Sequence, residues 1–500
     1  MTSSLDRTSS LRPLRPLRPV LVSVLALALA ACASSRGLQP QATLLDADSL
    51  QTQRTLSAAG LSQPGWPAAD WWRALGDPQL DALIAEGLQR NPGLDAADAR
   101  LRQARARIGT AHAERLPSVS ASGGYTGVRL PESMVGDELG GSYAGSGQAY
   151  LSFSYGIDLW GGKRAAWEAA VDSGHAAEVD AQAARLNLSA AIAEAYAQLG
   201  YAYTLHDVAS EELARSQKTL DLTAQRRRAG IDSDLQTRQA EARIPAAQQQ
   251  QQAAQQQIDE ARTALAALVG QGPDRGLQIE RPQVLNPLAL QLPGVLPSAL
   301  LGRRPDIVAA RWRVEAAHRE IHAAKAQFYP SLNLTALGGV VSSEVDQLLK
   351  SGSTFAFLGP ALSLPIFDGG RLRANLDKTD AQYDLAVADY NQSVVNALRD
   401  VADQVNAVRS LATQAAAQQQ AVDTARAAHD LAEQRYRAGI GSYLEVLVVE
   451  EQLLVSQQRL AELQSRQILV SVRLSQSLGG GFTPSGDTAT LATAPDSTHS

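Results

Sequence analysis

YGIDLWGGKR occupies residues 155–164, and PIFDGGRLR occupies residues 365–373. In each stretch, residues that alternate between apolar and polar side chains run directly into a long segment with helical periodicity. Each junction carries a glycine pair, Gly161–Gly162 or Gly369–Gly370, that follows an aspartate. Glycine adopts backbone angles that a β-carbon forbids, and a carboxylate near a helix start complements the positive end of the helix dipole. The chain is therefore expected to pass twice from a strand into a long helix.

The two junctions belong to an internal duplication. DLTAQRRRAGIDSDL begins at Asp221, DLAEQRYRAGIGSYL begins at Asp430, and ten of their fifteen positions are identical at an offset of 209 residues. Landmarks that recur in one order at a nearly constant offset indicate a repeat. The predicted organisation is a signal peptide (1–31), an N-terminal periplasmic segment (32–90), a first repeat (91–270), a linker (271–300), a second repeat (301–479) and a disordered tail (480–500).

The N-terminus has the features of a secreted bacterial protein. Four arginines precede the apolar run VLVSVLALALAA, which is too short for a stable membrane anchor and is typical of a signal peptide. Cys32, the only cysteine of the chain, follows at once in LAAC, a pattern that resembles a lipobox. This resemblance implies cleavage before Cys32, attachment of lipid to Cys32 and, because Ala33 follows, sorting to the outer membrane.

Each repeat contains two segments with the period-two pattern of an amphipathic strand. The pattern predicts strands at about residues 118–128, 148–159, 331–341 and 354–366. A length of about ten residues with one apolar face is typical of a membrane-spanning strand, although a soluble hairpin that covers a core has the same pattern. Four strands cannot close a barrel, so a membrane location requires that several copies of the chain assemble through these strands.

The segments after the glycine pairs predict long helices that pair as coiled coils. From Leu376 onward, apolar residues recur every seven positions in two registers, as in a coiled-coil seam. The proline-free runs 162–228 and 370–437 would each be about 100 Å long at about 1.5 Å per residue. Each run ends at RAGI, where Gly230 or Gly439 permits a tight reversal. Pro245 is expected to kink or locally break the first returning helix.

Together these stretches resemble the outer-membrane efflux protein family, the TolC/OprM/NodT group. The resemblance covers nearly the whole mature chain and rests on DWWRALGDPQLDALIAEGLQRNPGL from Asp70, IDLWGGKR from Ile157, LLGRRPDI from Leu300, YPSLNL from Tyr329, PIFDGGRLRA from Pro365 and the two RAGI turns. It implies a mainly α fold with a transmembrane β-barrel, built from two tandem repeats that each contain a β-hairpin and long coiled-coil helices. It also implies a homotrimer whose twelve-stranded barrel continues as a periplasmic α-helical barrel.

The same resemblance implies the function. Such a protein is the outer-membrane channel of a tripartite efflux pump, lipid-anchored in the cell outer membrane, with a tunnel that projects into the periplasm. Its implied partners are a periplasmic adaptor (membrane fusion) protein, an inner-membrane transporter of the RND type and outer-membrane lipid. Alternatives are the outer-membrane component of a type I protein secretion system, a constitutively open porin and a periplasmic scaffold lipoprotein. The exported substrate is not identified by the residues, and the net charge of −6 gives no support to a nucleic-acid partner.

The family closes the periplasmic tip of its channel with hydrogen bonds and salt bridges near the second reversal, and carboxylates surround the entrance. By position, the resemblance assigns Tyr436 to a gating tyrosine and Glu445 to an acidic ring, whereas a second acidic position is occupied by Val448. Asp232 and Asp234 lie at the matching tip of the first repeat. These four polar residues are the predicted periplasmic gate, and the alternative is a solvated helix-turn surface. Val448 puts a double cation-binding ring in doubt, because Glu450 and Glu451 lie nearby but out of phase.

No cofactor, metal site or catalytic residue is predicted. HREIH places His318 and His322 one helical turn apart, but Glu320 is one position late for the zinc motif HExxH, which favours a helix-surface pair. GIDLWGGK departs from the phosphate-binding loop at two positions, one of them Arg164 in place of the required Ser or Thr. The sequence therefore predicts a transport protein and not an enzyme.

Overall fold

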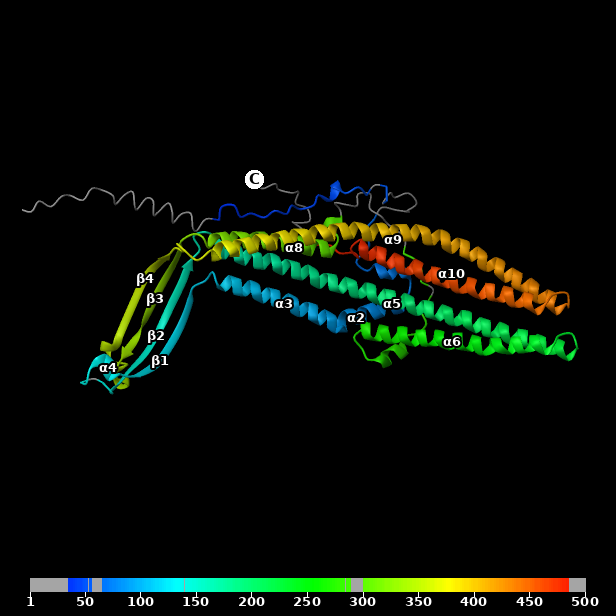
Figure 1. Cartoon of the computed structure of the whole chain (residues 1–500), viewed down its shortest axis with the longest axis horizontal. Helices are drawn as coiled ribbons and strands as arrows, with labels where there is room; N and C mark the ends of the chain where they lie inside the picture. The colour runs from blue at the N-terminus through cyan, green and yellow to red at the C-terminus, as the bar shows by residue number, and fades with distance from the viewer. Residues whose placement is uncertain are drawn as a thin grey trace, which may run out of the picture. The chain divides into compact units, whose positions relative to one another are not determined.

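The computed structural model describes residues 35–52, 54–55, 65–138, 140–283, 285–288 and 300–484. The predicted signal peptide, Cys32 and residues 485–500 of the predicted tail lie outside these ranges. Within the described residues, no helix combines the length and the apolar character that a membrane crossing requires. The chain divides into two compact units, and each unit takes segments from both repeats (Figure 1). Of the described residues, the smaller unit includes those within 106–172 and 314–386, and the larger includes those within 44–105, 173–313 and 387–484.

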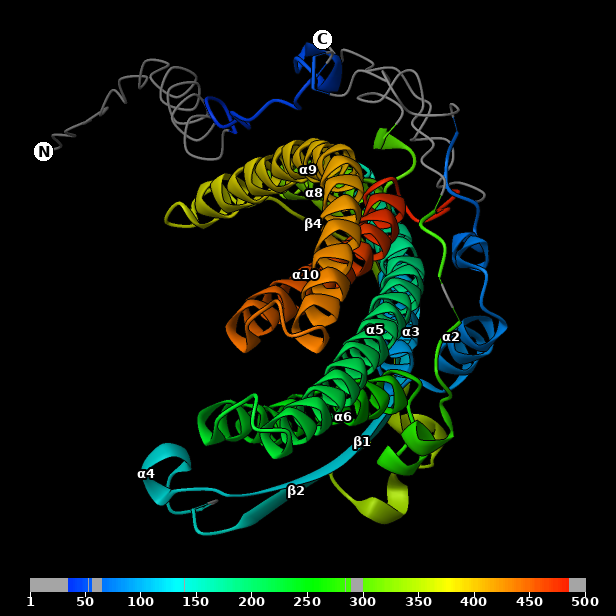
Figure 2. The ribbon, with the colours of Figure 1, turned by 90° about the vertical axis from the view of Figure 1, so that its right-hand side faces the viewer.

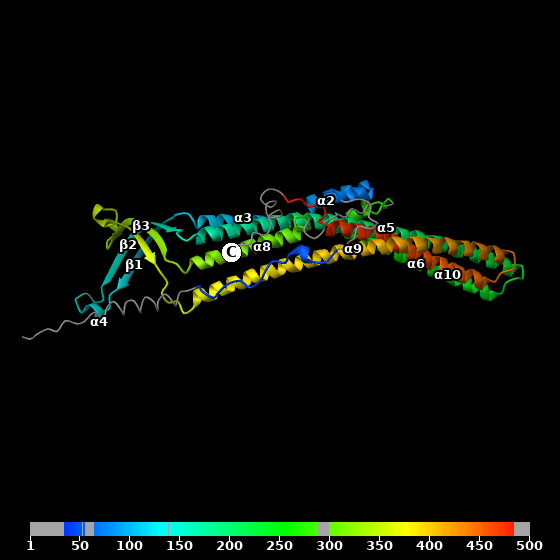
Figure 3. The same ribbon diagram turned by 90° about the horizontal axis from the view of Figure 1, so that it is seen from above.

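The smaller unit contains a four-stranded antiparallel sheet in the order β1-β2-β3-β4, with all four strands labelled in Figure 1 and the sheet seen from above in Figure 3. Its strands are β1 (Ser118–Arg129), β2 (Tyr143–Ile157), β3 (Ser331–Ser342) and β4 (Thr354–Ser363). The short helix α4 (Glu132–Val135) lies between β1 and β2. β2 begins before the expected residue 148, because Tyr143 and its neighbours continue the pairing with β1 as far as Arg129. β2 and β3 join the hairpins of the two repeats, from the pair Gly147 and Ser342 to the pair Ile157 and Leu332.

The sheet is not covered by a core. Every residue of β1 is exposed, including Val119 at 68%, and Leu358 on β4 is 72% exposed. A soluble hairpin would bury its apolar side chains against other elements, so the exposure argues against that alternative. Within the described chain, β1 pairs only with β2 and β4 pairs only with β3, so both outer strands have an open edge.

Four long helices follow the two junctions. α5 (Gly162–Arg228) and α9 (Arg371–Arg437) each have 67 residues, and α6 (Asp234–Leu268) and α10 (Tyr443–Ser477) each have 35. In the larger unit, α5 lies beside α6 and α9 lies beside α10, and both reversals lie at the same end (Figures 1 and 2). α6 continues through Pro245 without the expected break, and Ala240 and Ala247 on either side are buried. The predicted seam of α9 is also buried at most of its positions (Leu376, Tyr390, Ala397, Leu411, Val387, Val394 and Val401).

Shorter helices precede each hairpin. α3 (Pro92–Ala113) and α8 (Pro305–Ala326) occupy matching positions in the two repeats. α2 (Pro78–Arg90) begins after the cap Asp77, and its residues Leu80 and Ile84 are fully buried in the core of the larger unit, together with Ile192 of α5. This core packs α2 against α5 and α6.

The two strand-to-helix junctions are capped by their aspartates. Asp158 accepts hydrogen bonds from the backbone nitrogens of Lys163 (3.2 Å) and Arg164 (2.8 Å), and Asp368 accepts from those of Gly370 (3.0 Å) and Leu372 (2.9 Å). These bonds satisfy amides that the first turn of a helix leaves free.

The glycines of the junctions serve two different purposes. Gly161, Gly369 and Gly370 have positive φ values of 71°, 66° and 89°, as expected. Gly162 does not have a positive φ, so the expected backbone reason is wrong for this residue. A β-carbon at Gly162 would lie 2.6 Å from the β-carbon of Ala326, so glycine here allows α5 to pack closely on α8.

Candidate functional site

The two reversals have the same backbone structure. Gly230 and Gly439 have φ values of 72° and 78°, which only glycine adopts without strain. The backbone nitrogen of Ile231 donates to the carbonyl oxygen of Arg226 (2.9 Å), and that of Ile440 donates to the carbonyl oxygen of Arg435 (3.0 Å). This is the Schellman arrangement that ends a helix and reverses the chain within a few residues. It fixes where the side chains of both tips lie.

Arg226, Asp232 and Tyr436 form a polar contact between the tips, named here the tip network. Arg226 binds Asp232 through two hydrogen bonds, from Nε to Oδ2 (2.9 Å) and from Nη2 to Oδ1 (3.2 Å). Its Nη1 donates to the backbone carbonyl oxygen of Tyr436 (2.6 Å), and its guanidinium carbon lies 4.3 Å from the centre of the Tyr436 ring. The Tyr436 hydroxyl donates to Oδ2 of Asp232. The tip network therefore links the α5–α6 reversal to the end of α9.

The tip network is shielded from water. The side chains of Arg226 and Asp232 are 10% and 7% exposed, and Tyr436 is buried. Burial, and then the hydrogen bond to Asp232, raise the pKa of Tyr436, so its hydroxyl remains a donor at physiological pH. The hydrogen bond to Asp232 also raises the pKa of Arg226. Removal of one partner from a buried ion pair leaves the other charge buried and uncompensated, which lowers the stability of the fold.

Glu445 and Asp234, which were predicted beside Tyr436 and Asp232, lie outside the tip network. Asp234 has a side chain that is 81% exposed and that pairs with Arg227 at 2.7 Å. Glu445 is exposed in the first turn of α10, where its backbone nitrogen donates to the Ser442 hydroxyl (3.2 Å). A role for either carboxylate at a channel entrance stays a prediction. Arg226 was missed by the sequence reasoning, although it is the first of three arginines directly before the Gly230 turn.

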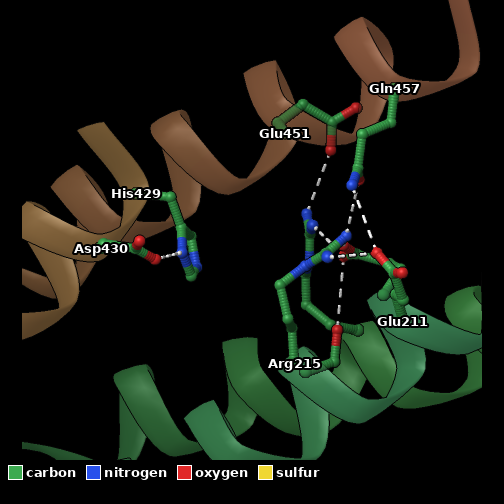
Figure 4. A network of polar contacts seen from close by, with 9 residues as sticks. Glu211, Arg215, His429, Asp430, Glu451 and Gln457 are labelled. Atoms are coloured by element: carbon green, nitrogen blue, oxygen red, sulfur yellow. Dashed lines mark hydrogen bonds and ion pairs between the residues drawn. The ribbon is translucent and has the colours of Figure 1, made fainter. Parts of the chain in front are cut away.

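A second group of polar side chains lies between the helical hairpins α5–α6 and α9–α10, which are called the hairpins from here on. It lies further from the reversals along the chain than the tip network does. We name Glu212 and Arg215 of α5, Arg243 of α6 and Glu450 of α10 the buried charge cluster. Glu212 pairs with Arg215 (3.0 Å) and with Arg243 (2.8 Å). From α10, Glu451 pairs with Arg243 (3.2 Å), and Gln457 accepts a hydrogen bond from Arg215 (3.2 Å) (Figure 4).

Glu450 is buried near Glu212, Arg243 and Arg215, and the sequence did carry a signal for its burial. The spacing of Tyr443, Val446, Glu450, Leu453 and Gln457 alternates between three and four residues, as in a coiled-coil seam, and all five are buried. The family resemblance places the second acidic position of the entrance at Val448, and Glu450 does not lie on the same face of the helix as that position. The seam instead places it inside the hairpin packing.

The profile of the outer membrane efflux protein family matches residues 83–271 and 296–480. The chain belongs to this family. This outer membrane efflux protein is 38% identical over 364 residues to the fusaric acid resistance protein FusA of Burkholderia cepacia, a match that covers 72% of the chain and 68% of FusA. It is 34% identical over 436 residues to the multidrug resistance outer membrane protein MdtP of Escherichia coli K12, covering 84% of the chain and 88% of MdtP.

The fold agrees with a solved structure of similar sequence. The outer membrane protein VceC from Vibrio cholerae is 39% identical, with a TM-score of 0.76 over 83% of this chain and all of VceC. The outer membrane efflux protein described here is therefore a mainly helical transport channel of the outer membrane, not an enzyme.

Proposed function

We propose that the protein is the exit duct of a tripartite efflux pump and that the tip network holds the duct closed at rest. The observation that carries this proposal is the bond between Asp232 and Tyr436, which joins the two hairpins where their helices reverse. Separation of the tips would break the bonds of Asp232 and Arg226 to Tyr436 and expose the Arg226–Asp232 pair, which lies within the first reversal, to water. A constitutively open porin needs no buried contact of this kind.

The sheet supports assembly of three copies. The open edges of β1 and β4 leave backbone groups unpaired, and the apolar side chains of the sheet are exposed. In lipid both problems are solved by strand pairing between copies, because a closed barrel has no edge. Three copies would supply the twelve strands implied by the family resemblance. Lipid on Cys32 would add an anchor to the outer membrane.

The proposed partners are a periplasmic adaptor and an inner-membrane transporter of the RND type. Relatives are named for resistance to fusaric acid, for multidrug resistance and for solvent efflux. We therefore propose small organic solutes as the cargo. In the proposed pump the inner-membrane transporter supplies the energy.

The experiment is dye efflux in a host that lacks its own outer-membrane channels for efflux. Wild-type protein, expressed with its adaptor and transporter, should lower the steady accumulation of a fluorescent organic dye. Omission of the transporter should abolish the effect. Loss of accumulated dye that does not depend on the transporter would instead support an open porin.

A further inference from the structure

Glu450 lies in the larger unit, in an environment that suits a neutral carboxylic acid better than a carboxylate. The residue is 1% exposed, and its Oε1 has no hydrogen-bond partner among the described residues. The charged groups near it come from every neighbouring helix: Glu212 and Arg215 from α5, Arg243 from α6 and Glu433 from α9. On α10 itself, the buried Tyr443 hydroxyl also has no hydrogen-bond partner among the described residues, and burial and then the charge of Glu450 raise the pKa of Tyr443.

The arginines near Glu450 are already paired. Arg215 pairs with Glu211 (3.5 Å) and Glu212 (3.0 Å), and Arg243 pairs with Glu212 (2.8 Å) and Glu451 (3.2 Å). Three carboxylates, those of Glu211, Glu212 and Glu451, therefore share two guanidinium groups, and no ion pair of the described residues includes Glu450. Burial without a partner disfavours the charged form of a carboxyl group, so such a group binds a proton and becomes neutral.

We propose that Glu450 binds a proton when the hairpins are packed and that this proton positions α10 for closure of the tip network. The inference rests on the proposed function of the tip network. When the proton leaves to water, Glu450 becomes a fourth carboxylate near the two arginines that Glu211, Glu212 and Glu451 already occupy, and it gains no new partner. The ionised form then favours an arrangement in which this part of α10 meets water.

An apolar cluster connects the part of α10 just before Glu450 to the tip network. Tyr443 and Val446, which precede Glu450 on the seam, lie in one buried cluster with Tyr436. The ring centres of Tyr436 and Tyr443 are 5.9 Å apart. A shift of α10 at Glu450 therefore changes the packing that holds the Tyr436 hydroxyl against Asp232.

The direction of the pH effect follows from the pKa. Burial, and then the nearby Glu212, raise the pKa of Glu450 from 4.5 to about 7, against the opposing influence of Arg243 and Arg215. The packed arrangement thus binds the proton more tightly than an arrangement that exposes Glu450. Closure is fully supported below pH 4.5, and the support is lost as the pH rises through about 7.

The effect of Glu450 must also be separated from that of a buried histidine of the larger unit. His429 of α9 is buried, and its Nδ1 lies 3.4 Å from an oxygen of Asp430 (Figure 4). His429→Gln is therefore part of the test.

The test is the fraction of time that the purified full-length protein stays open in planar bilayers between pH 5 and pH 8. In the wild type the ratio of open to closed time should rise with pH by up to about tenfold per unit. Glu450→Gln, which keeps the shape of the neutral acid, should stay closed throughout. His429→Gln and the matched α10 control Glu462→Gln should follow the wild type.

Two results would overturn the inference: a pH response that survives in Glu450→Gln, or a wild type whose open fraction does not change with pH. Asp232→Asn separates this inference from the proposed function. If Asp232→Asn opens the channel while Glu450→Gln has no effect on pH dependence, the tip network is the closure and Glu450 has no part in it. If Asp232→Asn stays closed while Glu450→Gln abolishes the pH response, the proposed closure by the tip network is wrong and Glu450 acts elsewhere.

Discussion

Replacement of Glu450 by glutamine should stabilise the tip half of α10 at alkaline pH and leave it unchanged at acidic pH. The pKa of Glu450 is raised from 4.5 to about 7, a difference of about 2.5 units. At about 1.36 kcal/mol per unit, the ionised residue lowers the stability of the packed hairpins by about 3 kcal/mol at pH 8. Because the folded pKa is raised, this cost is absent below pH 4.5 and is complete above pH 7.

Hydrogen exchange measures this cost where it arises. The amides around Glu450 exchange through local opening of α10, and about 3 kcal/mol corresponds to an exchange rate about 100-fold lower in Glu450→Gln than in the wild type at pH 8. At pH 5 the two proteins should exchange at nearly equal rates after correction for intrinsic chemistry. Glu462→Gln, further along α10, should match the wild type at both values. An equal difference between wild type and Glu450→Gln at pH 5 and pH 8 would refute the argument.

Two further predictions concern the reversals. Glu445→Gln should reduce the preference for cations in reversal-potential measurements across a salt gradient, because a ring of exposed carboxylates concentrates cations; an unchanged preference would remove Glu445 from the entrance. Gly439→Ala should destabilise the second reversal by about 1–2 kcal/mol, because alanine is strained at a φ of 78°. Limited proteolysis at this turn should be faster than in the wild type, whereas Gly272→Ala, which has open space and no positive φ, is the control.

Much of the helical architecture could be predicted from the sequence because the duplication states each feature twice. The ends of α5 and α9 at Arg228 and Arg437 follow from the RAGI turns, and the aspartate caps follow from the junctions. These are local features, in which a glycine or a capping carboxylate acts on its own few neighbours.

The candidate site was only partly predictable because its contacts join distant parts of the chain. Asp232 and Tyr436 were placed at the tips, but their mutual bond spans 204 residues and depends on how the two hairpins pack. Gly162 was assigned a backbone role, whereas its small size matters because Ala326, from the other repeat, lies against it. Glu450 was compared only with the acidic positions of the channel entrance. Its spacing from Val446 and Leu453 instead places it in the buried seam of α10.

The most direct test of the closed tip is the single-channel conductance of the purified protein at pH 6. Asp232→Asn leaves Arg226 buried without its charged partner, which should weaken closure by about 3 kcal/mol, or about 100-fold in the ratio of closed to open states. Asp234→Asn changes an exposed carboxylate of the same tip and is the matched control. The account predicts a small conductance for the wild type and Asp234→Asn and a large one for Asp232→Asn. A large conductance in all three proteins would contradict closure by the tip network.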